Sequence, residues 1–211
     1  MDTQISAIKQ WLGTGSINIF GLPMSGKDTQ GERLATMLGA KLLSSGIIIR
    51  AKEAETHQNL TDTGNLIPTD VFYEWILPYF YRTDLASSPL ILSSVGRWSS
   101  EEDGVLEAAK NSGHELKAVV LLNISEADVE GRWQAAKALG DRGNRKDDKD
   151  LTTFRNRLQE FRTKTLPVLQ HYKELGLLVE INGDQPRDAV TSEIVAKLSA
   201  IASKSLAETR I

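Results

Sequence analysis

The most constraining feature of this chain is a glycine-bounded loop that lies between an apolar run and a helical pattern. The apolar run at residues 16–20 is typical of a buried strand, and apolar residues recur at helical spacing up to residue 38. Between them, residues 21–27 read GLPMSGK. A strand, a G-x-x-x-x-G-K loop and a helix favour a phosphate site, because loop N–H groups and a helix N-terminus attract anions. A plain glycine-rich turn is the alternative, but the flanking elements favour the phosphate loop.

The glycines and the lysine of this loop have expected roles in binding phosphate. Glycine permits the tight backbone, and Lys27 supplies a mobile cation for the β- and γ-phosphates of a nucleotide. Serine or threonine usually follows this lysine directly. Here Asp28 follows it, and Thr29 comes one position later.

Composition narrows the class of protein. The 211 residues are 40% hydrophobic and 25% charged, which is enough for one domain with its own core. A net charge of −3 argues against nucleic acid as the main partner. The absence of cysteine excludes disulfides, thiolate metal sites and cysteine nucleophiles, and suits a reducing cytoplasm. The sequence shows no signal-peptide core and no run of membrane-spanning length.

Further along the chain, apolar runs alternate with helical patterns. Strands are expected at residues 41–44, 88–94, 117–124 and 177–181, each fully buried and the third of them beside the first strand of the chain. The pattern predicts an α/β fold with a five-stranded parallel sheet and helices on both faces. Residues 151–175 are expected to form one long helix. Thr69 or Asp70 is expected to cap a helix, and Ser125 with Asp128 another.

Several segments together resemble the adenylate kinase family of nucleoside monophosphate kinases. They are GLPMSGKDTQ at 21–30, SSGIIIR at 44–50, GNLIPTD at 64–70, VGR at 95–97 and RKDD at 145–148. The resemblance covers about residues 16–200. It implies a P-loop three-layer α/β/α fold in a single domain, 1–211, that acts as a monomer. Within it, a helical acceptor-binding insertion is expected at 45–81 and a short lid at 138–148.

The resemblance also implies sets of site residues. For ATP these are Gly21, Pro23, Met24, Ser25, Gly26, Lys27, Asp28, Thr29 and Arg132. For the acceptor monophosphate they are Ser45, Gly46, Arg50, Ile67, Arg97 and Glu101. Catalytic roles fall to Lys27, Arg97, Arg132, Arg145 and Arg157. Mg²⁺ is expected with ATP, near Thr29 and, through water, Ser93.

The chain departs from the family at several of these positions. Ile47 and Ser93 stand where the family has aspartate, and Asp28 stands where it has glycine. Counting charges raises the hypothesis that Asp28 partly replaces the lost acids. Glu101 stands in place of a glutamine that reads adenine, and Glu101 or Glu102 would favour a base with exposed donors.

The expected function is therefore an ATP-dependent nucleoside monophosphate kinase that transfers the γ-phosphoryl group of Mg-ATP, with AMP as the first candidate acceptor. Two alternatives remain open. One is a kinase for another nucleotide or small-molecule acceptor. The other is a nucleotide-binding protein with weak or no catalytic activity.

Overall fold

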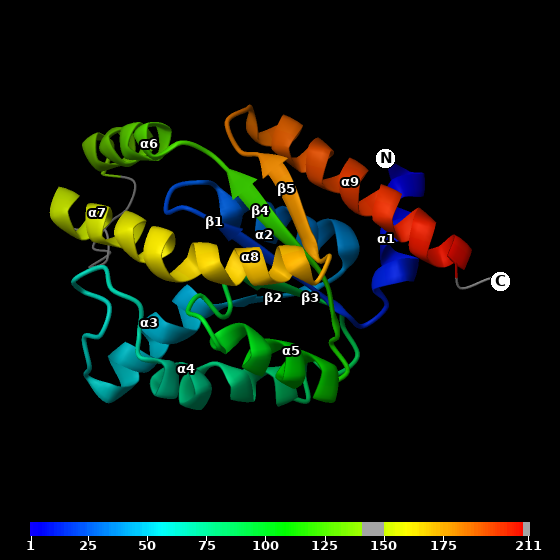
Figure 1. Ribbon diagram of the computed structural model, residues 1–211, viewed down its shortest axis with the longest axis horizontal. Coiled ribbons are helices and arrows are strands. Elements are labelled where there is room, and N and C mark those ends of the chain that lie inside the picture. Colours follow the sequence, from blue (N-terminus) through cyan, green and yellow to red (C-terminus); the bar gives the residue numbers. More distant parts are fainter. Residues whose placement is uncertain (141–149, 209–211) are drawn as a thin grey trace.

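The described part of the chain contains one parallel sheet of five strands, as the sequence predicts, and their order is β2-β3-β1-β4-β5 (Figure 1). The computed structural model describes residues 1–140 and 150–208. The strands are β1 (Ser16–Gly21), β2 (Lys41–Ser44), β3 (Leu90–Ser93), β4 (Leu116–Asn123) and β5 (Leu178–Asn182). All residues of β1 and β3 are buried, because both strands are covered on both faces. The edge strand β5 differs from the prediction, since its side chains alternate between buried and more exposed positions.

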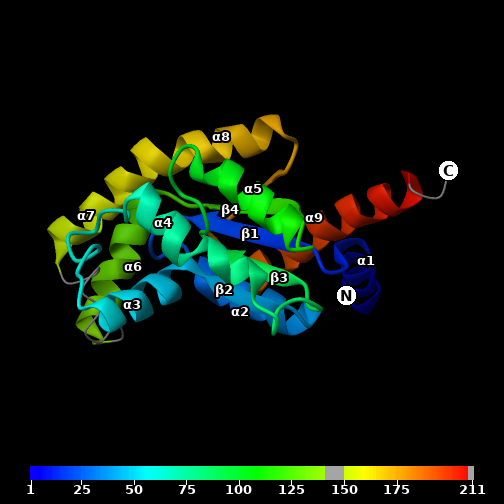
Figure 2. The ribbon, with the colours of Figure 1, turned by 90° about the horizontal axis from the view of Figure 1, so that it is seen from below.

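Helices cover both faces of the sheet (Figure 2). One face carries α1 (Asp2–Leu12), α2 (Lys27–Leu38) and α9 (Arg187–Glu208). The other carries α3 (Ser45–Thr56), α4 (Thr69–Trp75), the 3-10 helix η1 (Leu77–Tyr81), α5 (Glu101–Asn111) and α8 (Leu166–Glu174). Successive strand side chains point to opposite faces, so Ile19 packs with the first set and Phe20 with the second. The three-layer architecture is therefore confirmed.

Two further helices pack against each other where the chain leaves β1 and β4. They are α6 (Glu126–Ala138) and α7 (Leu151–Glu160). Trp133 of α6 stacks on Phe154 of α7, with ring centroids 5.4 Å apart, and Leu22 joins the same buried cluster. The chain between these helices was expected to form the short lid, 138–148. Residues 141–149, which include Arg145, lie outside the described part of the chain.

The helix expected over residues 151–175 is not a single α-helix. A π-helical turn, η3 (Phe161–Thr165), separates α7 from α8. Pro167 lies in the first turn of α8. A proline in a helix has no N–H to give the preceding turn, and its ring crowds that turn. The wider π turn immediately before it allows the chain to continue as a helix.

One of the two predicted helix caps is confirmed and the other is wrong. The Ser125 hydroxyl accepts the Asp128 backbone N–H at 3.1 Å and caps α6. At α4 the residue before the helix is Pro68, and no side chain caps it. The Thr69 hydroxyl instead faces Glu101, because a tertiary partner lies within reach.

None of the helices within residues 1–140 and 150–208 is both long enough and apolar enough to cross a membrane.

Candidate active site

A cleft of about 990 Å³, measured out to its open mouth, lies where β1, β2 and β3 end. The loop after β1, the first turn of α3, the end of β3 and one face of α7 form its walls. The carboxyl ends of parallel strands meet at one edge of the sheet, and α/β proteins place ligand sites there. The cleft thus gathers segments that are more than 100 residues apart in the chain.

The loop after β1 has the backbone of an anion-binding loop. Met24 has φ of 66° and Gly26 has φ of 90°, so both lie in the left-handed region on either side of Ser25. Such alternation turns successive N–H groups toward one concave side. Helix α2 begins at Lys27 directly after Gly26, which adds the partial positive charge of its N-terminus.

Ser25 explains why glycine is needed at the start of this loop. A Cβ placed on Gly21 would overlap the Ser25 hydroxyl. Ser25 is buried, and its hydroxyl oxygen has no hydrogen-bond partner among the described residues. A buried hydroxyl without a partner is costly, and a bound ligand is one way of satisfying it.

Asp28 and Ser93 meet at the base of the cleft. The Ser93 hydroxyl, buried at the end of β3, donates a hydrogen bond of 2.7 Å to the Asp28 carboxylate from the first turn of α2. Asp28, Thr29 and Ser93 all line the cleft. The carboxylate of Asp28 therefore lies beside the end of β3, where the strand itself carries only the Ser93 hydroxyl.

Three arginines form one wall of the cleft. Arg50 comes from α3, Arg97 from the loop after β3, and Arg157 from α7. A Cβ on Gly46 would lie 3.2 Å from the Arg50 guanidinium, so the glycine leaves room for Arg50 to lie across it. The Ser45 hydroxyl donates to the Ser94 carbonyl at 2.7 Å and ties the start of α3 to the end of β3. This wall presents a concentration of positive charge that suits phosphate groups.

A smaller pocket adjoins the arginine wall and contains Ile67, Phe72 and Glu101. The Glu101 carboxylate accepts the backbone N–H groups of Arg97 at 2.8 Å and Trp98 at 3.0 Å. Burial raises the pKa of Glu101 above its ordinary value, although these two hydrogen bonds and the Arg97 charge act in the opposite direction. The pocket therefore combines apolar walls with one carboxylate that can accept hydrogen bonds.

The structure brings most of the expected site residues to one place. The main cleft is lined by Met24, Gly26, Lys27, Asp28, Thr29, Ser45, Gly46, Arg50, Ser93, Arg97 and Arg157. Ile67 and Glu101 line the smaller pocket. Three residues of the loop belong to its frame and not to the cleft lining: Gly21, Pro23 and Ser25.

One expected arginine of the described residues, Arg132, is not part of this lining. Arg132 lies on α6, where its guanidinium donates to the Gly183 carbonyl at 3.2 Å and lies 3.7 Å from the Asp184 carboxylate. Arg145 falls outside the described residues. The roles expected of these two side chains stay predictions.

The sequence interpretation missed part of the lining. Thr61, Asn65 and Leu66 line the cleft from the loop before α4, and Glu160 and Phe161 line it from the end of α7. For Glu160 a local signal was present: it lies three residues after Arg157 and therefore on the same face of a helix.

Comparison with known proteins agrees with this geometry, although no protein-family model matches the chain. The chain is 31% identical over 192 residues to an adenylate kinase of Methylobacterium radiotolerans, across 86% of this chain and 94% of that protein. It is also 31% identical over 194 residues to an adenylate kinase of Thermus thermophilus, across 89% and 99% respectively. A Synechococcus adenylate kinase is 29% identical over 187 residues. With these relatives, and with a phosphate loop and three arginines lining one cleft, the chain belongs to the adenylate kinase family of phosphotransferases.

Proposed function

We propose that this protein transfers the γ-phosphoryl group of Mg-ATP to a nucleoside monophosphate, with AMP as the first candidate acceptor. The observation that carries the proposal is that a phosphate loop and three arginines line one cleft. The relatives are named adenylate kinases, which supports this reaction class.

The mechanism follows from charge and position. Phosphoryl transfer depends mainly on alignment and electrostatic stabilisation, and it needs no side-chain nucleophile. Lys27 and the loop N–H groups would bind the donor phosphates. Arg50 and Arg97 would bind the acceptor monophosphate, and Arg157 would stabilise charge on the transferring group.

Arg132 and Arg145 enter the proposal through the resemblance to the family. Both are assigned to the transferring group, together with a closing lid at 138–148 and an acceptor-binding region at 45–81. Closure that excludes water favours transfer to the acceptor over hydrolysis of ATP. We further propose a cytoplasmic monomer that binds neither nucleic acid nor membrane, which the net charge of −3 supports.

The residues at the base of the cleft fit Mg²⁺. This ion prefers oxygen ligands and retains several of its waters. Asp28, Thr29 and Ser93 supply one carboxylate and two hydroxyls beside the phosphate loop. When bound, Mg²⁺ neutralises charge on the donor phosphates. Asp28 and Ser93 would orient its water shell, and Thr29 would offer a hydroxyl oxygen to the ion.

The hydrogen-bonding chemistry of Glu101 bears on which acceptor base the smaller pocket takes. Glu101 is a carboxylate, so it accepts hydrogen bonds and, when ionised, donates none. Adenine presents both a donor and an acceptor on its pairing edge, whereas guanine presents two donors. Guanine is therefore a second candidate for the acceptor base, and an assay that includes both AMP and GMP decides between the two.

The test is a coupled assay with ATP, Mg²⁺ and each of AMP, GMP, CMP and UMP. We expect turnover with at least one monophosphate and the highest kcat/KM for AMP. Lys27→Ala serves as the matched control and should lower kcat on the order of a hundredfold or more. Turnover highest with another acceptor would correct the substrate assignment. ATP binding without transfer to any monophosphate would favour a nucleotide-binding protein and contradict the proposed reaction.

A further inference from the structure

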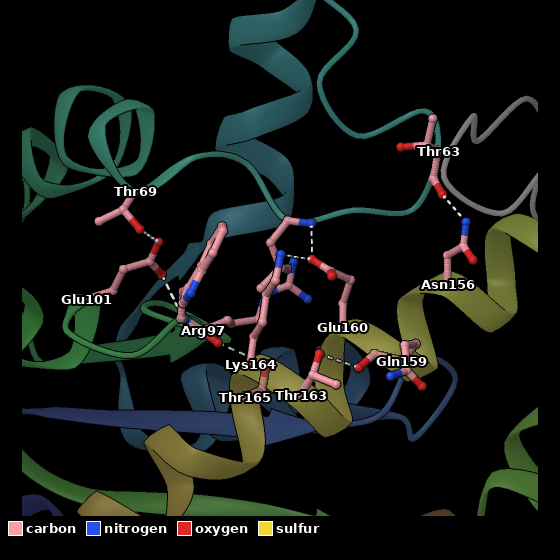
Figure 3. Close-up of polar contacts among 12 residues, drawn as sticks. Thr63, Thr69, Arg97, Glu101, Asn156, Gln159, Glu160, Thr163, Lys164 and Thr165 are labelled. Carbon is pink, nitrogen blue, oxygen red and sulfur yellow. Dashed lines mark hydrogen bonds and ion pairs between the residues drawn. The ribbon is translucent and has the colours of Figure 1, made fainter.

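The loop between α3 and α4 is placed by its contacts with α7. It contains no helix or strand from residue 57 to residue 68. Asn156 donates to the Thr63 carbonyl at 3.1 Å, and the Leu66 backbone N–H donates to the Glu160 carboxylate at 2.9 Å (Figure 3). Gly64, with φ of 85°, lies so close to α7 that a Cβ there would overlap the Thr153 carbonyl oxygen. Leu66 and Glu160 both line the proposed acceptor side of the cleft.

The segment after β3 is placed by the π-helical turn η3. The Thr165 hydroxyl donates to the Arg97 carbonyl at 3.1 Å. The Lys164 ammonium lies 3.7 Å from the centre of the Trp98 ring. That distance is well within the range of about 6 Å for a cation–π interaction. Arg97, the neighbour of Trp98, lines the cleft. The turn therefore holds the residue that carries a proposed phosphate contact.

Glu160 and Lys164 connect the loop before α4 with the segment after β3. The Lys164 ammonium lies 2.7 Å from the same Glu160 oxygen that accepts the Leu66 N–H. The side chains are 23% and 14% exposed, so solvent screens this pair less than it screens a surface pair. A continuous path then runs from Leu66 through Glu160 and Lys164 to the Trp98 ring, with every link within contact distance. Figure 3 shows Glu160 and Lys164, the middle link of this path.

We propose that Lys164 is a positioning residue for the acceptor substrate. Through Glu160 and Trp98 it sets the spacing between the loop at Leu66 and the segment of Arg97, which form two sides of the acceptor site. The π turn makes this arrangement, because it presents Lys164 and Thr165 together to the segment after β3. Helical π turns often occur at functional sites. The inference rests on the proposed function and extends it to residues remote from the phosphate loop.

Lys164→Ala tests the inference by steady-state kinetics with the best monophosphate of the panel. Both interactions of the ammonium are lost, so the acceptor KM should rise about five- to tenfold. The KM for ATP should stay within twofold. Lys164→Arg should restore the acceptor KM to within twofold of wild type, since a guanidinium keeps the charge and stacks on aromatic rings. Lys173→Ala, at an exposed lysine of α8, is the matched control and should change neither KM.

The ring is tested separately. Trp98→Ala should raise the acceptor KM by a similar factor, whereas Trp98→Phe should keep most of the effect of the ring. The factors for Lys164→Ala and Trp98→Ala should not multiply in the double variant, because the two residues share one contact. If Lys164→Ala does not fold, Lys164→Gln replaces it, because it keeps most of the length without the charge.

The outcomes separate this inference from the proposed function. An active wild type with an unchanged acceptor KM in Lys164→Ala overturns the inference alone. An equal rise in the KM values of ATP and acceptor also overturns it, because it indicates a general structural loss. A wild type that transfers phosphate to none of the monophosphates overturns the proposed function and this inference with it.

Discussion

At the base of the cleft, the Ser93 hydroxyl donates a hydrogen bond to the Asp28 carboxylate at 2.7 Å. The resemblance to the family implies an acid where Ser93 stands and a glycine where Asp28 stands, so the carboxylate of Asp28 lies beside the position where the acid is lacking. The carboxylate reaches the end of β3 from the first turn of α2, directly after the phosphate loop. Because Mg²⁺ is held largely through its waters, an acid delivered from either element can serve the same water shell.

This arrangement predicts a reciprocal rescue. Asp28→Gly should weaken Mg²⁺ binding to the protein–ATP complex about tenfold, because a carboxylate outside the first coordination shell is removed. Adding Ser93→Asp in the same chain should restore most of that affinity. Ser93→Asp alone is less informative, since it places two like charges within hydrogen-bond distance. Calorimetric titration of Mg²⁺ into the complex with a non-hydrolysable ATP analogue measures this without turnover. An affinity that is unchanged in Asp28→Gly would show that Asp28 does not serve the metal.

At the scale of elements, the start of α5 shows how one helix organises the loop before it. Glu101 is the first residue of α5, and its carboxylate accepts the N–H groups of Arg97 and Trp98. A negative charge at this end is favoured by the helix dipole. Burial nevertheless raises the pKa of Glu101 above its ordinary value, with desolvation as the largest cause. The loop that carries Arg97 is thus held by a carboxylate that is costly to ionise.

The raised pKa of Glu101 makes the stability of the fold depend on pH. A carboxyl whose folded pKa exceeds its unfolded value holds its proton more tightly in the folded state. Its contribution to stability is therefore present at low pH and is lost as pH rises from about 4.3, the unfolded value, through the raised folded pKa. Relative to Glu101→Gln, the wild-type free energy of unfolding should fall across this window and then level off. Urea unfolding at a series of pH values measures the difference, and a difference that grew with pH would refute the direction of the shift.

At the scale of the whole molecule, the residues that pack α1 onto the core are not the residues that line the cleft. Helix α1 precedes the sheet and packs against α9, on the face opposite α5 and α8 (Figures 1 and 2). Ile8 is fully buried in the cluster that contains Ile194 and Leu198 of α9. None of these residues lines the cleft. Helix α1 therefore contributes to the core and has no contact with the proposed chemistry.

Ile8→Ala should accordingly destabilise the fold without altering substrate binding. Truncation of a fully buried isoleucine to alanine costs about 2–5 kcal/mol in free energy of unfolding. The KM values for both substrates should match wild type below the unfolding transition. Lys9→Ala, one position along on the exposed side of α1, is the control and should leave stability within about 0.5 kcal/mol. A changed KM in Ile8→Ala at low temperature would show that α1 acts on the site.

The parts of this protein that its sequence determines are those set by neighbouring residues. The phosphate loop follows from glycine at positions 21 and 26 and from the lysine that opens α2. The strands follow from their apolar runs, and the cap of α6 follows from Ser125 and Asp128, three residues apart. Of the arginines that the resemblance assigns to the site, Arg50, Arg97 and Arg157 line the cleft, whereas Arg132 lies on α6 outside the lining.

The tertiary structure decided what depends on residues far apart in the chain. Thr69 or Asp70 was expected to cap helix α4, yet the Thr69 hydroxyl faces Glu101, 32 residues away. Glu160 joins the acceptor side through Leu66, 94 residues away, and Arg132 contacts Gly183, 51 residues away. A side chain with several partners of similar strength takes the one that folding brings within about 3 Å. Helix propensity and residue spacing describe only neighbours along the chain. Which distant residue becomes a side chain's hydrogen-bond partner is decided by the packing of the folded structure.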